Sequence, residues 1–456
     1  MAEIAAPPPA KPKLRTSLPP GPRDHPLLQA GRFFFRGEPF LEACRESYGD
    51  TFTLRGPGDL RIVITCDPEV VKEVFTGEPN LLHAGESNRV LRPLLGSKSL
   101  LLLDGPEHLR HRRLMLPPFH GERMRGYGEA MGEIARRHIA RWPLGRPFAV
   151  QGSMQDITLE VIIRTVFGIE EPARKERLAV PLRRVIGLAD GPRGTLRMGA
   201  AMLSERAQRS RHGPLRRLWT LMKPVDEVLM AEVRERRAGA GGGEDILSLL
   251  LTARDEEGQP LTDTEIRDEL MTLVVAGHET TATGLSWAVE RLTRTPAVLD
   301  RLYGVRGEDR EAYIDAIAKE TLRLRPVVPG VGRLLQEPME FGGYRLRAGT
   351  VIAPSIVLMH RRSDIYPEPR RFRPERFLER TPGTYEWIPF GGGVRRCIGA
   401  SFALFEMRTV LEAMVESVRL APSGAPGEQP RRRLVTLVPS RGGRVRVERP
   451  LAARPG

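Results

Sequence analysis

Apolar residues recur at steps of three and four along most of the chain between about residue 67 and residue 325. This spacing predicts helices that each bury one face. A further helix is predicted over residues 401–418, where the repeating apolar positions are Leu404, Met407, Leu411, Met414 and Val418. Short runs rich in β-branched residues predict strands. They lie at residues 51–55, 60–66, 351–356, 433–439 and 444–448.

The first two strand-like runs flank a Gly-Pro-Gly sequence, which predicts a β-hairpin. Residues 440–443 are expected to turn between the last two runs. Asp67 followed by Pro68 predicts a helix start, and the glycine-rich residues 239–243 predict a loop between helices. These patterns predict a mainly α fold with a minor β component near each end of the chain.

The longest predicted helix begins at Thr262 and ends before Pro296. Thr262 and Glu265 form the Thr-x-x-Glu pattern of a capping box, in which each side chain bonds the other's backbone N–H. At about 1.5 Å per residue the helix is roughly 50 Å long, enough to cross a whole domain.

Length and composition allow a large core, in one large domain or in two or three ordinary ones. The chain has 456 residues, of which 40% are hydrophobic. Residues 1–24, rich in alanine and proline, are predicted to be a flexible tail and residues 450–456 a C-terminal tail, which leaves residues 25–449 as the folded part.

The net charge of +14 raises the question of a nucleic-acid or membrane partner. No nucleic-acid motif is present and only 6% of residues are aromatic, so we expect no nucleic acid. The alternatives are an arginine-rich surface without a partner and a basic face for an acidic electron-donor protein.

The cysteines and the apolar runs bear on where the protein acts. No apolar run is long enough to span a bilayer, and the first residues lack the apolar segment of a secretory signal, so we expect no membrane anchor. The cysteines are Cys44, Cys66 and Cys397, an odd number that favours a reducing compartment. The first two are predicted to be buried, and the protein to be cytoplasmic.

Cys397 carries the strongest chemical signal. It lies in Phe390-Gly-Gly-Gly-Val-Arg-Arg-Cys-Ile-Gly399, just before the predicted helix 401–418. A helix N-terminus favours a thiolate, which is a good ligand for a soft metal. The glycines allow positive φ and the close approach of a flat, bulky group. The alternative is a small buried residue in a turn.

The pattern Phe-Gly-x-Gly-x-Arg-x-Cys-x-Gly resembles the haem-thiolate loop of cytochromes P450. The resemblance implies that residues 25–449 form a single domain with the P450 fold, in which a long central helix lies over haem b. It also implies that Cys397 is the axial ligand of the haem iron, within a loop that includes Phe390, Gly391 and Gly399.

A second motif lies in the middle of the long helix, at Ala276-Gly-His-Glu-Thr-Thr281. Gly277 costs roughly 1 kcal/mol relative to alanine in a helix, and the Thr280 hydroxyl can bond the carbonyl one turn back. Taken alone, the segment is equally compatible with an ordinary buried helix. It resembles the P450 motif Ala-Gly-x-Asp/Glu-Thr-Thr, which implies that Ala276 borders the cofactor. Thr280 would then hydrogen-bond dioxygen and water, and Glu279 would relay protons.

His108 and Arg112 are spaced i, i+4 on a predicted helix. The stretch resembles the His-x-x-x-Arg element by which bacterial P450s bind the haem propionates; the alternative is a solvated basic face. Arg395 is a third candidate for the propionates and Arg333 a fourth.

Two further motifs predict a buried charged cluster. Glu320-Thr-Leu-Arg323 resembles the P450 Glu-x-x-Arg motif, and the Pro-Glu-Arg-Phe sequence that contains Arg376 matches another. The resemblance implies that Arg376 joins Glu320 and Arg323 in a cluster with a structural role.

Together these motifs imply a haem-thiolate monooxygenase that inserts one atom of dioxygen into a hydrophobic small molecule, such as a fatty acid or terpenoid. Electrons would come from a ferredoxin or flavodoxin with its reductase, and the enzyme would be a monomer. A basic docking face is predicted at Arg110, Arg113 and Arg396. Two alternatives are a peroxide-using P450 of the same fold and a non-catalytic haem-binding sensor. Glu279 and Thr280 favour dioxygen over both.

Five segments are expected to line the substrate pocket. Its expected segments are residues 84–103, 180–230 and 327–331, the helix around Val274 and the strand near Leu437. Their apolar residues are expected to bind a hydrophobic ligand.

Overall fold

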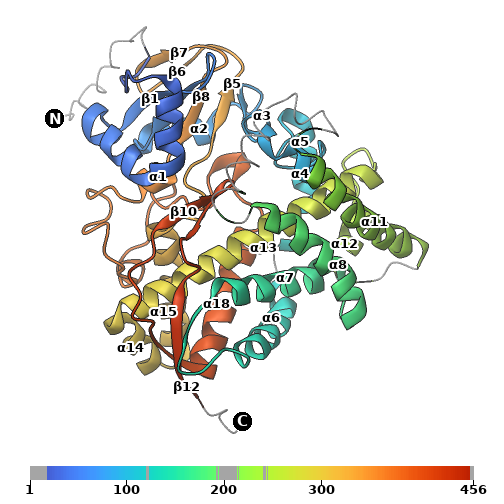
Figure 1. Ribbon diagram of the computed structural model, residues 1–456. Coiled ribbons are helices and arrows are strands. Elements are labelled where there is room, and N and C mark those ends of the chain that lie inside the picture. Colours follow the sequence, from blue (N-terminus) through green and yellow to red (C-terminus); the bar gives the residue numbers. More distant parts are fainter. Residues whose placement is uncertain are drawn as a thin grey trace, which may run out of the picture.

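The computed structural model describes residues 18–119, 123–189, 191, 194, 213, 215–239, 243 and 245–451. Helices make up most of the molecule, and a small sheet with α1 lies at one end of it (Figure 1). Residues 1–17 and 452–456 of the predicted tails, and much of the 180–230 segment, lie outside the described residues.

The described helices and strands follow in chain order. The helices are α1 (Pro26–Tyr48), α2 (Pro68–Thr76), α3 (Ala84–Ser87), α4 (Arg92–Leu95), α5 (Gly105–Met115), α6 (Arg123–Ile139), α7 (Gln151–Phe167), α8 (Pro172–Ile186), α11 (Arg216–Ala238), α12 (Ile246–Thr252), α13 (Asp263–Arg294), α14 (Pro296–Gly304), α15 (Gly307–Leu324), α16 (Ile356–Met359), α17 (Arg376–Glu379) and α18 (Ala400–Ser417). The strands are β1 (Thr51–Arg55), β2 (Arg61–Thr65), β3 (Leu82–His83), β4 (Pro147–Ala149), β5 (Arg333–Leu335), β6 (Met339–Phe341), β7 (Tyr344–Leu346), β8 (Val351–Pro354), β9 (Val418–Pro422), β10 (Pro430–Arg433), β11 (Thr436–Pro439) and β12 (Arg444–Pro450).

Helix α13 crosses the middle of the molecule, as Figure 1 shows. Its predicted capping box is confirmed: the Glu265 N–H donates to Thr262 Oγ1 at 3.3 Å, and the Thr262 N–H donates to Glu265 Oε2 at 2.7 Å. The helix ends at Arg294, before Pro296. Most of its residues are buried, because α7, α15 and α18 all pack against it.

The largest sheet has the strand order β1-β2-β8-β5-β3. Its β1–β2 pair is the predicted hairpin, with Thr51 opposite Thr65 and Arg55 opposite Arg61. Strand β8 extends the sheet in parallel with β2. A small core forms between this sheet, α1 and α2, and it includes the buried thiols Cys44 and Cys66, as predicted.

The C-terminal strands differ from the prediction. Residues 433–439 do not form one strand: Arg433 ends β10, the chain reverses at Leu434, where φ is 53°, and residues 436–439 form β11. Strand β11 therefore pairs with β10, whereas β12 pairs with β4 and β9. The turn at 440–443 is present, but it joins strands of different sheets.

The predicted charged cluster is confirmed. Arg323 donates to both carboxylate oxygens of Glu320, at 2.6 and 2.9 Å, and Arg376 Nε donates to Glu320 Oε1 at 3.2 Å. Glu320 and Arg323 are fully buried. The cluster ties α15 to α17 and so holds in place the long segment that precedes the cysteine loop.

None of the helices in the described part of the chain is long and apolar enough to cross a membrane.

Candidate active site

A cavity of about 620 Å³ lies at the centre of the molecule, a size typical of small-molecule sites. Its walls come from α5, α7, α13, the large sheet, the cysteine loop and the β10–β11 hairpin. Every predicted site residue lines it. They are His108, Arg112, Ala276, Glu279, Thr280, Arg333, Phe390, Gly391, Arg395, Cys397 and Gly399.

Cys397 lies on the cavity wall, two residues before the N-cap of α18, Gly399. Its backbone N–H donates to the Phe390 carbonyl at 3.0 Å, which closes the loop. Cys397 is accessible from the cavity that it lines. Burial raises the pKa of the thiol, and it outweighs the Gly399 N–H and the nearby Arg112 and Arg396. We expected the helix N-terminus to lower the pKa of the Cys397 thiol, but desolvation of the thiolate raises this pKa instead.

The three glycines before Cys397 have different roles. Gly391 and Gly393 both have positive φ, 68° and 63°. A Cβ on Gly393 would lie 1.8 Å from the Phe75 carbonyl oxygen, and one on Gly392 would lie 2.2 Å from the Phe75 ring. Two of the glycines thus allow α2 to pack against the loop, whereas Gly391 lines the cavity. The sequence indicated the positive φ, but not that Gly392 and Gly393 make room for Phe75.

Helix α13 brings Ala276, Glu279 and Thr280 to the cavity. The Thr280 hydroxyl donates to the Ala276 carbonyl, as predicted from their spacing. Gly277 has a packing reason as well: a Cβ there would lie 2.8 Å from Ile162 Cδ1 of α7. With its proton committed to Ala276, the Thr280 oxygen is left as an acceptor towards the cavity.

The partners of Glu279 were missed from the sequence. Its carboxylate is in an ion pair with Arg433, at the end of β10, and accepts a hydrogen bond from Gln155 Nε2 of α7 at 3.0 Å. Arg433 is 154 residues away along the chain. No local pattern could indicate the pair.

A cationic group surrounds His108, which is 2% exposed. Burial and the neighbouring Arg395, Arg112 and Arg333 lower the pKa of His108 to about 3, so the imidazole is neutral. Burial also lowers the pKa of Arg333 and of Arg395 to about 10, and both remain charged at neutral pH.

These residues fit a cofactor that carries two carboxylates. Arg395 pairs with Asp104, while the Arg112 side chain donates to the Arg396 carbonyl and that of Arg333 to the Gly332 carbonyl. The three guanidinium charges around His108 face one carboxylate, that of Asp104, which leaves two positive charges beside His108. The two propionates of haem would neutralise them, and a thiol on the cavity wall is placed to become the iron ligand.

The predicted docking arginines are not equivalent. Arg110 Nε pairs with Asp255 at 2.5 Å and its Nη1 with Glu265 at 3.1 Å, and Arg113 pairs with Glu256 at 2.5 Å. Arg396 is exposed.

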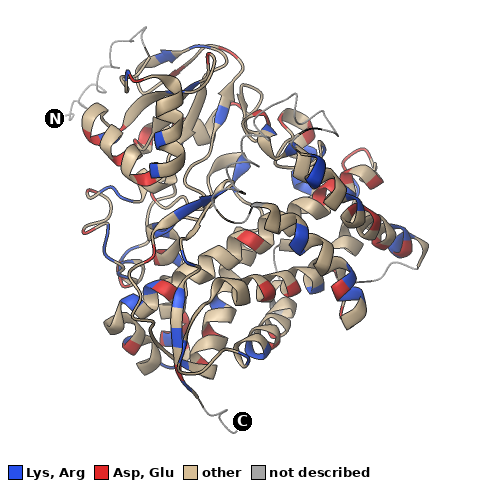
Figure 2. Cartoon of the chain, viewed as in Figure 1, with Lys and Arg blue, Asp and Glu red and all other residues tan. Residues whose placement is uncertain are grey.

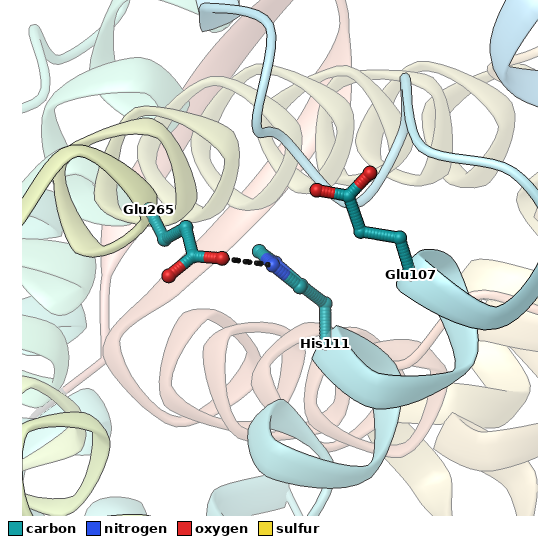
Figure 3. Close-up of side chains that lie close together, drawn as sticks. All are labelled: Glu107, His111 and Glu265. Carbon is teal, nitrogen blue, oxygen red and sulfur yellow. Dashed lines mark hydrogen bonds and ion pairs between the residues drawn. The ribbon is translucent and has the colours of Figure 1, made fainter. Parts of the chain in front are cut away.

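Figure 3 shows a group of Glu107, His111 and Glu265 that has the residue types of a metal site. Its charges are already compensated. Lys98 pairs with Glu107 at 2.5 Å, and buried His111 bonds Glu265 at 3.1 Å and Glu269 at 2.7 Å. We interpret it as a clamp between α5 and α13.

Comparison with known proteins relates this chain to the cytochrome P450 family. The family model for cytochrome P450 matches residues 19–446. A putative cytochrome P450 135B1 of Mycobacterium tuberculosis is 45% identical over 94% of this chain and 91% of its own length. A putative cytochrome P450 135A1 of the same species is 37% identical over 95% and 96%.

Solved structures share the fold. The retinoic acid-bound cyanobacterial CYP120A1 has a TM-score of 0.81 at 22% identity, covering 96% of this chain and 100% of its own. The haem domain of cytochrome P450DA has a TM-score of 0.79 at 26% identity, with coverages of 96% and 99%. The chain belongs to the cytochrome P450 family. The predicted P450 fold, the P450 enzyme class and haem b as the cofactor are thereby confirmed.

Proposed function

We propose that the protein is a haem-thiolate monooxygenase that inserts one atom of dioxygen into a hydrophobic small molecule, such as a fatty acid or terpenoid. The observation that carries the proposal is that Cys397 and the Thr280–Glu279 pair line one cavity. The remaining wall is largely apolar, which suits a hydrophobic ligand and excludes water.

The roles of the residues follow from their contacts. Cys397 would ligate the haem iron, and His108, Arg112, Arg333 and Arg395 would hold the propionates. Bound haem supplies the iron at which dioxygen is activated. The Thr280 oxygen, whose own proton goes to Ala276, can accept a hydrogen bond in the cavity and hold a water or a protonated oxygen there.

Glu279 is placed to move protons towards that position. It borders the cavity and is adjacent to Thr280, while its side chain is 12% exposed. Arg433 and Gln155 hold its carboxylate. Proton delivery would require this carboxylate to exchange between these partners and a water beside Thr280.

The electron donor is proposed to be a ferredoxin or flavodoxin with its reductase. Exposed Arg396, next to Cys397, is the strongest candidate for the contact, because Arg110 and Arg113 already pair with carboxylates. We also propose that the protein is a monomer and that it acts in the cytoplasm. The second proposal is supported by Cys44 and Cys66, which are buried free thiols, as a reducing compartment allows.

The decisive experiment is the spectrum of the ferrous–CO complex. A thiolate ligand gives a strongly red-shifted Soret band, and Cys397→His should abolish it while haem is retained. A wild-type band without this shift would overturn the proposal.

Turnover experiments distinguish the two alternatives. Thr280→Ala should uncouple NADH-driven product formation but keep peroxide-driven product formation. A wild-type enzyme that forms product only with peroxide would indicate a peroxide-using P450. Some fatty acids, terpenes or steroids are expected to shift the Soret band. If none of these compounds is converted to a product, a haem-binding sensor would be favoured.

A further inference from the structure

Arg396 is exposed, and Arg432 differs from the remaining cations that line the cavity. Glu279 is the sole carboxylate among the described lining residues, and it pairs with Arg433. Arg112, Arg333 and Arg395 lie around His108, by the cysteine loop. Within the described residues Arg432 takes part in no ion pair, and its Nε is enclosed without a hydrogen-bond partner.

The Arg432 guanidinium packs against an aromatic ring, in a cavity whose other lining residues are mostly uncharged. Its guanidinium lies over the ring of Phe33 from α1, 4.9 Å from the ring centre. Phe33 and Arg432 both line the cavity, together with Ile62 and Leu434. Figure 2 shows β10 as a blue strand among largely tan elements. Burial lowers the pKa of Arg432, with no carboxylate to oppose the shift.

A buried cation without a counter-ion is unfavourable, so a site that keeps one is suited to an anionic ligand. A guanidinium binds a carboxylate with two parallel hydrogen bonds, and its contact with an aromatic ring fixes its plane. The apolar wall between Arg432 and the Thr280 region would cover a hydrocarbon body.

We infer that the substrates are apolar molecules with one terminal carboxylate, which binds Arg432, while the hydrocarbon body extends towards Cys397 and Thr280. This inference rests on the proposed function and narrows its substrate class. It predicts that oxidation occurs away from the carboxyl end, because that end is held at the β10–β11 hairpin.

The test compares acids with their esters. Purified haem-loaded enzyme is titrated at pH 7.5 with the C8 to C16 saturated fatty acids and with their methyl esters, followed by the Soret shift and by calorimetry. The acid of best-fitting length should bind at least about tenfold more tightly than its ester. If no acid binds more tightly than its ester, the inference is wrong.

Variants of Arg432 test whether this residue causes the preference for acids over esters. Arg432→Gln should weaken acid binding by about tenfold and leave ester binding unchanged, and Arg432→Lys should restore part of the acid preference. Arg431→Gln is the matched control, because Arg431 is adjacent on β10 but does not line the cavity. An equal loss for acid and ester in Arg432→Gln would assign Arg432 to packing on Phe33. Loss of haem from Arg432→Gln would assign Arg432 to the cofactor. Either result overturns the inference.

The two proposals fail separately. A normal thiolate-type CO spectrum with equal acid and ester binding would overturn only the carboxylate site. A CO spectrum without the red shift would overturn the proposed function, whatever the acids do.

Discussion

The carboxylate of Glu279, in the middle of α13, is in an ion pair with Arg433 at the end of β10. Their side chains are 12% and 6% exposed. The pair joins the helix that carries Thr280 to the hairpin that carries Arg432. The pair therefore helps to fix the relative positions of Thr280 and Arg432, the two ends of the proposed substrate site.

Breaking this pair should destabilise the protein. Arg433→Gln leaves the Glu279 charge without its ion-pair partner, and we expect the free energy of unfolding to fall by about 3 kcal/mol. The double variant Glu279→Gln/Arg433→Gln should recover most of the loss, measured by urea unfolding of the haem-loaded protein. Equal losses in the single and double variants would show that the pair contributes little.

The free energy of unfolding should also fall when the buried cluster around Glu320 is broken. Glu320→Gln leaves Arg323 and Arg376 without their carboxylate, and we expect a loss of about 3–5 kcal/mol and poor haem retention. The control is Glu368→Gln, which removes the exposed pair with Arg371 at 3.2 Å and should cost less than about 1 kcal/mol. Similar midpoints for the two variants in thermal unfolding would contradict the structural role.

The His111 clamp should make stability depend on pH. Burial disfavours the imidazolium, but Glu269 and Glu265 outweigh it and raise the pKa of His111 above 6.5. Burial likewise raises the pKa of Glu269, so the folded pair holds its proton more tightly than the unfolded chain does. The stabilisation is complete below about pH 6.5 and is lost as the pH rises through the folded pKa.

The measurement is urea unfolding of wild type and His111→Gln between pH 6 and pH 9. The free energy of unfolding of the wild type should exceed that of His111→Gln by the largest margin at pH 6. This margin should shrink as the pH rises. A margin that stays constant or grows would show that His111 is neutral in the folded state.

Gly393 should not tolerate a side chain. With φ at 63° and a Cβ position 1.8 Å from the Phe75 carbonyl oxygen, Gly393→Ala must displace α2 or the cysteine loop. We expect little haem-loaded protein on expression. Gly152→Ala is the control, because that helical glycine has nothing within 4 Å of its Cβ position and alanine should stabilise it by up to about 1 kcal/mol. Normal haem content in Gly393→Ala would refute the packing role.

The surface charges near Cys397 should control reduction. Arg396→Glu should slow reduction by a ferredoxin and flatten its dependence on salt, since steering by charge is screened by ions. Arg113→Glu should have a smaller effect, because Arg113 already pairs with Glu256. Stopped-flow reduction rates that are the same in both variants and wild type would place the contact elsewhere.

Local patterns predicted much of this molecule. The capping box at Thr262, the hairpin at residues 51–66 and the helix after Cys397 each depend on residues close in sequence, and all are present. The motif residues that line the cavity came from the resemblance to the P450 family. Their spacing alone left alternatives open.

What the sequence could not predict depends on contacts between distant segments. Nothing near Glu279 indicates Arg433, and nothing near Gly393 indicates Phe75. Residues 433–439 read as one strand because the reversal occurs at Leu434, which is not a typical turn residue. Likewise, the thiol of Cys397 was expected to ionise more easily, but burial outweighs the helix N-terminus.

The two surplus positive charges beside His108 have a consequence for how the enzyme matures. Like charges that lie close together inside a protein repel each other. The repulsion among these arginines therefore destabilises the folded chain. Haem brings the missing anions, and its binding free energy adds directly to the stability of the folded state. We therefore expect the chain to unfold at a lower temperature before it has taken up haem than afterwards.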